Sequence, residues 1–274
     1  MVWGRGGPPP QVFQEKIMSF WDVSYRKEEG VAVIGLGAPP KNHNELARLA
    51  DSVSDLCTEI TLDKEIRVVV LTGSRDDSFF PGEDLLGTVP GSGGEAQIMY
   101  WRPAEPVAGL ACPTIAALHG MVIGQGLELA LACDIRFASE NASFGLPHIK
   151  KDFIPWDGGT QRLIRAVGKA KAMEMILTGD VIDAREAHRI GLVNRLFPAD
   201  KLISGVIEIA RDMASKGPIS LEYAKEAINK GFDLTLEQGL RLEADLYFLI
   251  HTTKDRTEGI KAFQGKRKPR FEGK

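Results

Sequence analysis

One stretch of the sequence decides the fold class: residues 112–159, CPTIAALHGMVIGQGLELALACDIRFASENASFGLPHIKKDFIPWDGG. It begins with an apolar run of strand length (112–120), which leads through a glycine turn into a short apolar helix. The run IRFAS (135–139) then returns as a second strand. Continuous apolar runs are typical of strands that are buried on both faces of a parallel sheet. The stretch therefore predicts repeated strand–turn–helix units in an α/β core.

The flanking sequence extends this pattern in both directions. Toward the N-terminus, VSYRKEEGVAVIGLG (23–37) predicts a β-hairpin, and IRVVVLTGS (66–74) predicts another buried strand. Between them, apolar residues recur at spacings of three and four over 46–56, which indicates a helix. After Gln161 the pattern is mainly helical, apart from a short strand in LVNRLF (192–197). Strand–helix units followed by helices predict an α/β core with a helical C-terminal region.

The chain shows no linker between independent domains and no internal repeat. We expect a flexible N-terminal segment over 1–20, which is rich in Pro and Gly at its start. The α/β core is expected over 21–205 and the helical C-terminal region over 206–274.

The composition excludes several classes of protein. A charged content of 26% and a net charge of −3 argue against a general attraction to nucleic acid. Three cysteines far apart in the sequence form neither a disulfide framework nor a metal site, and no histidine has ligand spacing. No run approaches the roughly 18 apolar residues of a membrane span, and the N-terminus lacks the pattern of a signal peptide. We expect a cytoplasmic protein without a metal.

The glycine turn before the apolar helix is a candidate site for an oxyanion. Gly124 and Gly126 permit a tight turn, and the first N–H groups of the following helix are free to bind an oxygen. Glu128 lies one turn into this helix among apolar neighbours only. A buried carboxylate is unfavourable unless it is paired or functional. Glu128 is therefore either a general acid or base, or a group that caps backbone or pairs with an arginine.

A second candidate site lies in GLPHIKKDFIPWDGG (145–159). His148 and Asp157 stand nine positions apart, on either side of the apolar residues and of the turn former Pro155. The segment is either a surface turn with a hydrogen-bonded histidine or the wall of an active site. In an active site, Asp157 either orients the imidazole of His148 or serves as the acid or base itself.

Taken in order, these residues resemble the crotonase superfamily, the enoyl-CoA hydratases and isomerases. The resemblance extends from about residue 21 to 271. It includes SFFPGEDL (78–85) and LTGDVIDAREAHRIGLVNRLF (177–197) beside the central stretch. It implies a spiral of ββα units with a helical C-terminal trimerisation region. It also implies a trimer or a dimer of trimers, and a thioester of coenzyme A as substrate.

The resemblance also implies roles for particular residues. Two backbone N–H groups that stabilise an enolate oxygen fall on Glu83 and Gln125. The glutamate that activates water falls on Glu128, whereas the second glutamate of the hydratases is replaced by His148. Asp157 falls on the same wall of the site.

The basic C-terminal stretch AFQGKRKPRF (262–271) is similar to the segment through which a neighbouring subunit holds the nucleotide of CoA. The two residues concerned are Phe263 and Lys266, and a lysine suits a phosphate. No cofactor is expected apart from CoA as part of the substrate.

The sequence predicts an enoyl-CoA hydratase/isomerase-like lyase of acyl-CoA metabolism, with Glu128 and either His148 or Asp157 as acid–base groups. A rival follows from the pair His148 and Asp157, which is similar to the 6-oxocamphor hydrolase branch of the superfamily. Such an enzyme breaks a carbon–carbon bond of a cyclic β-diketone without CoA. The sequence leaves open the acyl group, the choice among hydration, isomerisation and C–C hydrolysis, and the choice between trimer and hexamer.

Overall fold

The computed structural model describes residues 23–37, 43–73, 78–81 and 102–274. Its first element is a hairpin of β1 (Val23–Glu28) and β2 (Val31–Leu36), which pair antiparallel. The two turn residues, Glu29 and Gly30, both have positive φ angles, 48° and 81°. Two-residue turns of this kind match the twist of the paired strands. The predicted hairpin is confirmed.

The main sheet has six strands in the order β1-β2-β3-β5-β7-β10. Its remaining members are β3 (Val68–Gly73), β5 (Thr114–Leu118), β7 (Ile135–Ser139) and β10 (Arg195–Phe197). All pairs from β2 to β10 are parallel. Alternate side chains of β3 enter two different apolar clusters, so this strand is buried on both faces as predicted.

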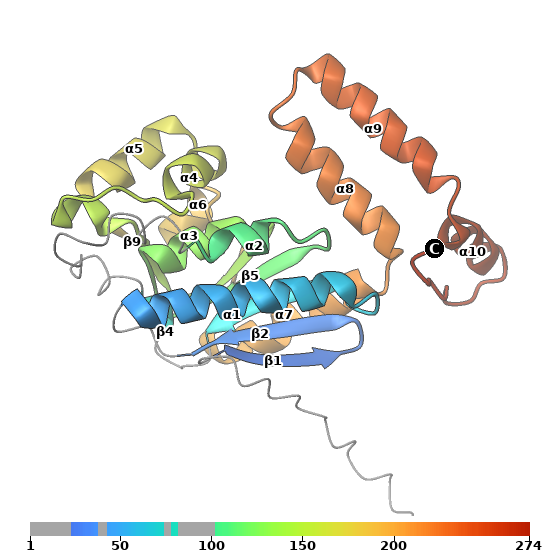
Figure 1. The fold of residues 1–274 in the computed structure, drawn as a ribbon, viewed down its shortest axis with the longest axis horizontal. Coiled ribbons are helices and arrows are strands. Elements are labelled where there is room, and N and C mark those ends of the chain that lie inside the picture. Colours follow the sequence, from blue (N-terminus) through green and yellow to red (C-terminus); the bar gives the residue numbers. More distant parts are fainter. Residues whose placement is uncertain (1–22, 38–42, 74–77, 82–101) are drawn as a thin grey trace, which may run out of the picture.

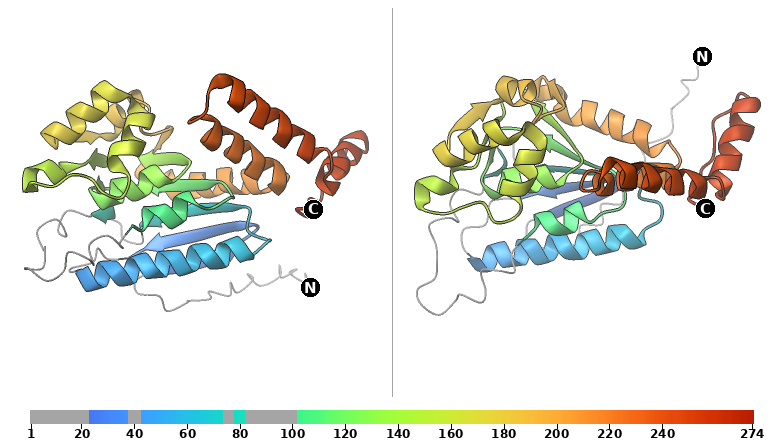
Figure 2. Two further views of the ribbon diagram at one scale, coloured as in Figure 1. Left: turned by 45° about the horizontal axis from the view of Figure 1, so that its top comes forward. Right: turned by 90° about the horizontal axis from the view of Figure 1, so that it is seen from above.

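Helices cover both faces of this sheet. Helix α7 (Leu202–Ala214) packs on one face through Leu202, Val206 and Ala210. Helix α1 (His43–Leu62) and the short helix α2 (Ala104–Ala108) lie on the other side (Figures 1 and 2). The predicted helix over 46–56 is confirmed as the middle of α1.

A second sheet turns the chain into a spiral. Its four short strands are β4 (Ser78–Pro81), β6 (Met121–Ile123), β8 (Ser143–Gly145) and β9 (Val181–Asp183). Strands β3, β5 and β7 of the main sheet are each followed in sequence by a strand of this second sheet. The spiral of ββα units is therefore present. Its second strands were not predicted separately, because three or four residues are too short for a periodic pattern.

Further helices lie between β8 and β10 in the chain. They are α4 (Gly159–Val167), α5 (Lys169–Thr178) and α6 (Ala184–Arg189). The single-turn 3₁₀ helix η3 (Pro147–Lys151) leads into them, and another, η4 (Ala199–Lys201), precedes α7.

The last three helices stand away from the sheets (Figure 1). Helices α8 (Pro218–Gly231) and α9 (Leu236–Ile250) run antiparallel side by side, and α10 (Lys254–Gln264) lies beyond them. They expose a set of large apolar side chains: Ile228, Phe232, Leu234, Leu236, Leu240, Tyr247, Phe248, Leu249, Ile260 and Phe263. The helical C-terminal region is confirmed.

Two expectations about organisation are not tested by the structure. The boundary drawn between residues 205 and 206 lies inside α7, which packs on the main sheet, and the division into three regions stays a prediction. The N-terminal segment 1–20 lies outside the described residues. Among the helices described, none is long and apolar enough to cross a membrane.

Candidate functional site

Helix α3 (Gln125–Ala132) begins at the glycine turn and is buried along its whole length. Gly124 precedes it with φ 59° and ψ −126°, a conformation that favours glycine. A Cβ on Gly126 would lie 1.9 Å from the carbonyl oxygen of Phe80, at the end of β4. Glycine is therefore required for β4 to approach the first turn of α3. The N–H of Gln125 is in that turn, where helix amides have no intrahelical acceptor.

The carboxylate of Glu128 is fully buried and is held at one of its two oxygens. Its Oε1 accepts hydrogen bonds from the backbone N–H groups of Asp157 and Gly159, both at 2.8 Å. A Cβ on Gly159 would lie 2.9 Å from the same oxygen, so the loop must carry glycine there. Glu128 thus caps backbone, as one of the two readings of the sequence expected, while its Oε2 makes no hydrogen bond to the described residues.

His148 lies beside the free oxygen of Glu128. It is the second residue of η3 and is also fully buried. Its Nε2 is 3.6 Å from Oε2 of Glu128, longer than a hydrogen bond. In the described part of the chain neither ring nitrogen has a hydrogen-bond partner. The histidine therefore faces Glu128, and no hydrogen bond joins it to a described atom of Asp157.

The side chain of Asp157 is held from a different direction. Its Oδ2 accepts a hydrogen bond from the backbone N–H of Ala104, at the start of α2, at 2.9 Å. Its Oδ1 lies 3.8 Å from Nε of Arg102 and accepts no hydrogen bond from the described residues. The pKa of Asp157 is raised to about 7, mainly by burial and in part by the nearby carboxylate of Glu128. The hydrogen bond from the backbone N–H of Ala104 and the positive charges of Arg162 and Arg102 lower this pKa.

Arg162 supports the loop that carries these amides. Its Nη1 donates to the backbone carbonyl of Asp157 at 2.8 Å. Gly158 has a φ of 99°, and a Cβ there would lie 2.2 Å from that same nitrogen. A turn of this shape directs the N–H groups of residues 157 and 159 toward Glu128.

The side chain of Gln125 belongs to the same site. It is only 2% exposed, and neither Nε2 nor Oε1 has a hydrogen-bond partner among the residues described. The sequence predicted a role for its backbone only. The signal that marks the side chain is a polar residue three positions before Glu128 on a helix that is otherwise apolar. The sequence also did not reveal the amides of Ala104 and Gly159 or the side chains of Arg102 and Arg162, since backbone donors and single arginines leave no pattern in a sequence.

The predicted CoA-binding residues do not lie beside Glu128 of the same chain. Phe263 and Lys266 are exposed, at the end of α10 and just after it. Both views place α10 at the far side of the molecule from α3 (Figures 1 and 2). Glu83 lies outside the described residues.

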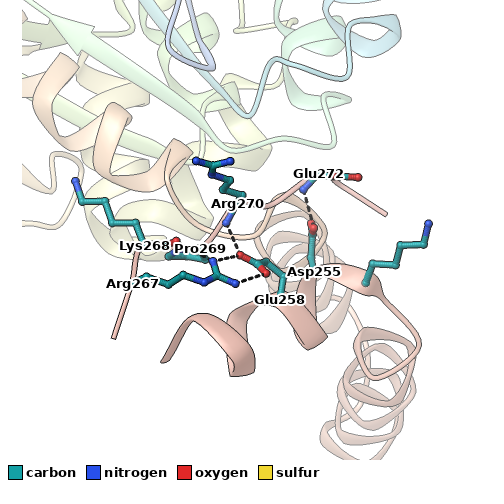
Figure 3. A pocket seen from close by; sticks show the side chains of 8 residues that line it. Asp255, Glu258, Arg267, Lys268, Pro269, Arg270 and Glu272 are labelled. Atoms are coloured by element: carbon teal, nitrogen blue, oxygen red, sulfur yellow. Dashed lines mark hydrogen bonds and ion pairs between the residues drawn. The ribbon is translucent and has the colours of Figure 1, made fainter. Parts of the chain in front are cut away.

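The chain after Lys266 is fixed to α10. Arg267 forms a two-pronged ion pair with Glu258, and Asp255 accepts a hydrogen bond from the N–H of Glu272 (Figure 3). The other oxygen of Asp255 accepts one from the N–H of Gly273. These contacts surround an open hollow of about 700 Å³ lined by charges of both signs. The ion pair and the hydrogen bonds hold the tail in place, and with it the position of Lys266. No group of three or more His, Cys, Asp or Glu in the described part of the chain is arranged to hold a metal ion.

The fold has two sheets in a ββα spiral, and it buries the carboxylate of Glu128 together with the titratable side chains of His148 and Asp157. This combination defines an acid–base enzyme. Residues 26–274 match the enoyl-CoA hydratase/isomerase family. The chain belongs to this family, and it is an enoyl-CoA hydratase-like enzyme of the crotonase superfamily.

Similar proteins support this assignment over nearly the whole chain. The crotonyl-CoA hydratase of Syntrophomonas wolfei is 35% identical over 261 residues, which cover 93% of this chain and 99% of that protein. The mitochondrial methylglutaconyl-CoA hydratase of Rattus norvegicus is 33% identical and covers 99% of this chain and 90% of its own. A crystal structure of enoyl-CoA hydratase from Bacillus anthracis superposes with a TM-score of 0.83 at 38% identity, over 92% of this chain and all of that one.

The family, the fold and the enoyl-CoA hydratase-like activity expected from the sequence are thereby confirmed. The rival reading as a C–C bond hydrolase is not favoured, because the relatives are named as hydratases. The roles of the individual site residues stay predictions.

Proposed function

We propose that the protein adds water across the α,β-double bond of an enoyl-CoA thioester, or removes it, with Glu128 as the group that handles the water. The observation that carries this proposal is the arrangement of Glu128. Two backbone amides hold its Oε1, and its Oε2 faces His148 without a hydrogen bond of its own to a described residue. A buried carboxylate with one fixed and one available oxygen is suited to accept a proton from water.

In the proposed reaction the thioester oxygen is bound by the backbone N–H groups of Gln125 and Glu83. Oε2 of Glu128 takes a proton from water, and the water oxygen forms a bond to Cβ of the substrate. The electron pair of the double bond moves through Cα onto the thioester oxygen and forms an enolate. A second acid then gives a proton to Cα and restores the thioester. Backbone donors aimed at a developing oxyanion typically contribute about 10²–10³ in rate each.

We assign the second proton transfer to Asp157. Its pKa of about 7 allows it to give and take a proton near neutral pH, and Oδ1 accepts no hydrogen bond from the described residues. His148 then serves as a neighbour of the water and of Glu128, since its Nε2 lies 3.6 Å from Oε2. The same groups can instead move a proton between Cα and Cγ, which is isomerisation.

Replacement of the carboxylate tests the proposal. Glu128→Gln keeps the shape of the side chain but removes the base, so turnover of crotonyl-CoA should fall by about 10²–10⁴. Circular dichroism should show an unchanged fold. Glu140→Gln, an exposed glutamate of the same protein, is the matched control and should leave turnover unchanged. Wild-type turnover in Glu128→Gln would remove Glu128 from the mechanism.

The proposal includes an assembly of three subunits or a dimer of trimers. The exposed apolar side chains of α8, α9 and α10 support it, since a patch of this kind on a soluble protein usually marks an interface. The remoteness of Phe263 and Lys266 from Glu128 in one chain supports it as well, because in an assembly they can contact the CoA bound to a neighbouring copy. The proposal needs no cofactor beyond the CoA of the substrate, and it places the enzyme in the cytoplasm.

A further inference from the structure

The side chain of Gln125 has no role in the proposed reaction, although it lies in the site. The side chain is only 2% exposed. Neither its Nε2 nor its Oε1 has a hydrogen-bond partner within the described ranges. Burial of an unpaired amide is unfavourable, and such groups are rare in folded proteins. A buried amide that is unpaired among the described residues is suited to bind a group that enters the site.

Its position points to the substrate as that partner. Gln125 and Glu128 are three residues apart on α3, so their side chains leave the same side of the helix. The other unpaired buried atoms of the described chain belong to Glu128, His148 and Asp157. Within the part of the chain that the structure describes, the unpaired buried side-chain atoms therefore all come from residues of one site.

The chemistry of the amide limits what it can do there. A glutamine side chain donates two hydrogen bonds and accepts two, and it does not titrate. Glu128, His148 and Asp157 can exchange protons with water and with Cα, whereas Gln125 can only bind. An acyl chain made of carbon and hydrogen offers it nothing to bind.

We propose that the side chain of Gln125 recognises an oxygen atom on the acyl group, so that the preferred substrate is an acyl-CoA with a carbonyl or hydroxyl oxygen beyond the thioester. Both oxygens accept a hydrogen bond from Nε2, and a hydroxyl also donates one to Oε1. This inference rests on the proposed function and specifies its substrate class. Sites built to hydrogen-bond a substrate group discriminate strongly against an analogue that lacks it, since the protein's own polar group is then left unpaired.

Binding of unreactive, saturated thioesters tests the inference without turnover. Calorimetry would compare butyryl-CoA with 3-oxobutyryl-CoA and 4-hydroxybutyryl-CoA, which present a carbonyl and a hydroxyl. The wild-type protein should bind at least one of the two oxygenated esters about 10-fold or more tightly than butyryl-CoA. Which of them binds more tightly distinguishes the carbonyl from the hydroxyl.

The variant Gln125→Met replaces the amide by an apolar side chain of similar length. It should reduce the preference for the oxygenated ester by about 10-fold or more, measured as the ratio of the two Kd values. Gln125→Leu provides a second apolar replacement if the first does not fold, as judged by circular dichroism. The wild-type comparison needs neither variant.

Two results would overturn the inference. If the wild type binds butyryl-CoA as tightly as both oxygenated esters, or if the preference survives in the variants, Gln125 does not read an acyl oxygen. In either case the proposed hydratase stands. If the wild type binds none of the three esters, the proposed acyl-CoA function fails together with the inference.

Discussion

At the scale of single residues, a different part of the chain holds each of the three titratable groups of the site. Glu128 is held by amides of the loop after Pro155, Asp157 by the first amide of α2, and His148 by its place in η3. Each side chain keeps at least one polar atom without a hydrogen bond to the described chain. Acid–base chemistry needs such free atoms, because a proton can be transferred only at an atom that substrate or water can reach.

The raised pKa of Asp157 has a consequence for stability. In the folded protein this pKa is about 7, against a value of 3.8 for an unperturbed aspartate. The folded state therefore binds the proton more tightly than the unfolded state. The contribution of Asp157 to stability is fully present below about pH 4 and is lost as the pH rises to about 7, by at most about 1.4 kcal/mol for each pH unit.

Asp157→Asn removes this dependence, because an amide does not titrate. Relative to the wild type, the variant should gain in free energy of unfolding between pH 4 and pH 7, and the difference should be constant above about pH 7.5. Urea unfolding at a series of pH values measures it. Asp152→Asn is the control, since Asp152 is exposed on the same loop. Parallel profiles of Asp157→Asn and wild type would show that Asp157 is ionised throughout this range.

At the scale of elements, the site depends on one loop between η3 and α4. Residues 157–159 supply both amides that hold Glu128, and helix α4 supports them through the side chain of Arg162. Errors of about 1 Å in the position of a catalytic group can reduce the rate by about 10²-fold. The arginine is thus expected to act on the rate through the position of Glu128.

Arg162→Met tests this support. The variant keeps the aliphatic part of the side chain and loses the hydrogen bond to the carbonyl of Asp157. We expect kcat for crotonyl-CoA to fall about 10-fold or more, while KM changes little because Arg162 does not contact the substrate in the proposed complex. Arg165→Met, one turn later on α4, is the matched control and should leave both constants unchanged, since Arg165 pairs only with exposed groups. An equal rise in KM for both variants would indicate a general effect of lost charge instead.

At the scale of the whole molecule, the chain places its CoA-binding candidates far from its own Glu128. Helices α8 to α10 extend away from the sheets and carry Phe263 and Lys266 with them (Figure 1). The ion pair of Arg267 with Glu258 fixes the tail next to Lys266. A complete site is therefore expected only where two subunits meet.

Lys266→Ala should weaken binding of a CoA ester by about 1–3 kcal/mol, the loss expected of a charge-assisted contact. Calorimetry with butyryl-CoA measures it, and Lys268→Ala, another exposed lysine of the tail, is the control. The oligomeric state of both variants would be checked by light scattering, which should show a trimer or hexamer. A monomer with unchanged CoA affinity in Lys266→Ala would contradict the proposed assembly and the role of this lysine together.

The sequence by itself determined the local elements and which of them are buried. The apolar run of β3, the two-residue turn after β1 and the apolar helix around Glu128 all follow from patterns within about ten residues. Such patterns are visible because burial selects the side chains of each element directly. The resemblance carried by residues 112–159 added the family and the spiral, which periodicity alone does not reach.

Only the tertiary structure decided what each polar atom of the site touches. Oε1 of Glu128 accepts from amides 29 and 31 residues further along the chain, and Asp157 accepts from one 53 residues before it. The sequence left open whether Asp157 orients His148, and the structure directs its carboxylate to Ala104 instead. It also buried the side chain of Gln125 without a partner among the described residues. Backbone donors look alike in every sequence, so their partners are set only when distant segments pack together.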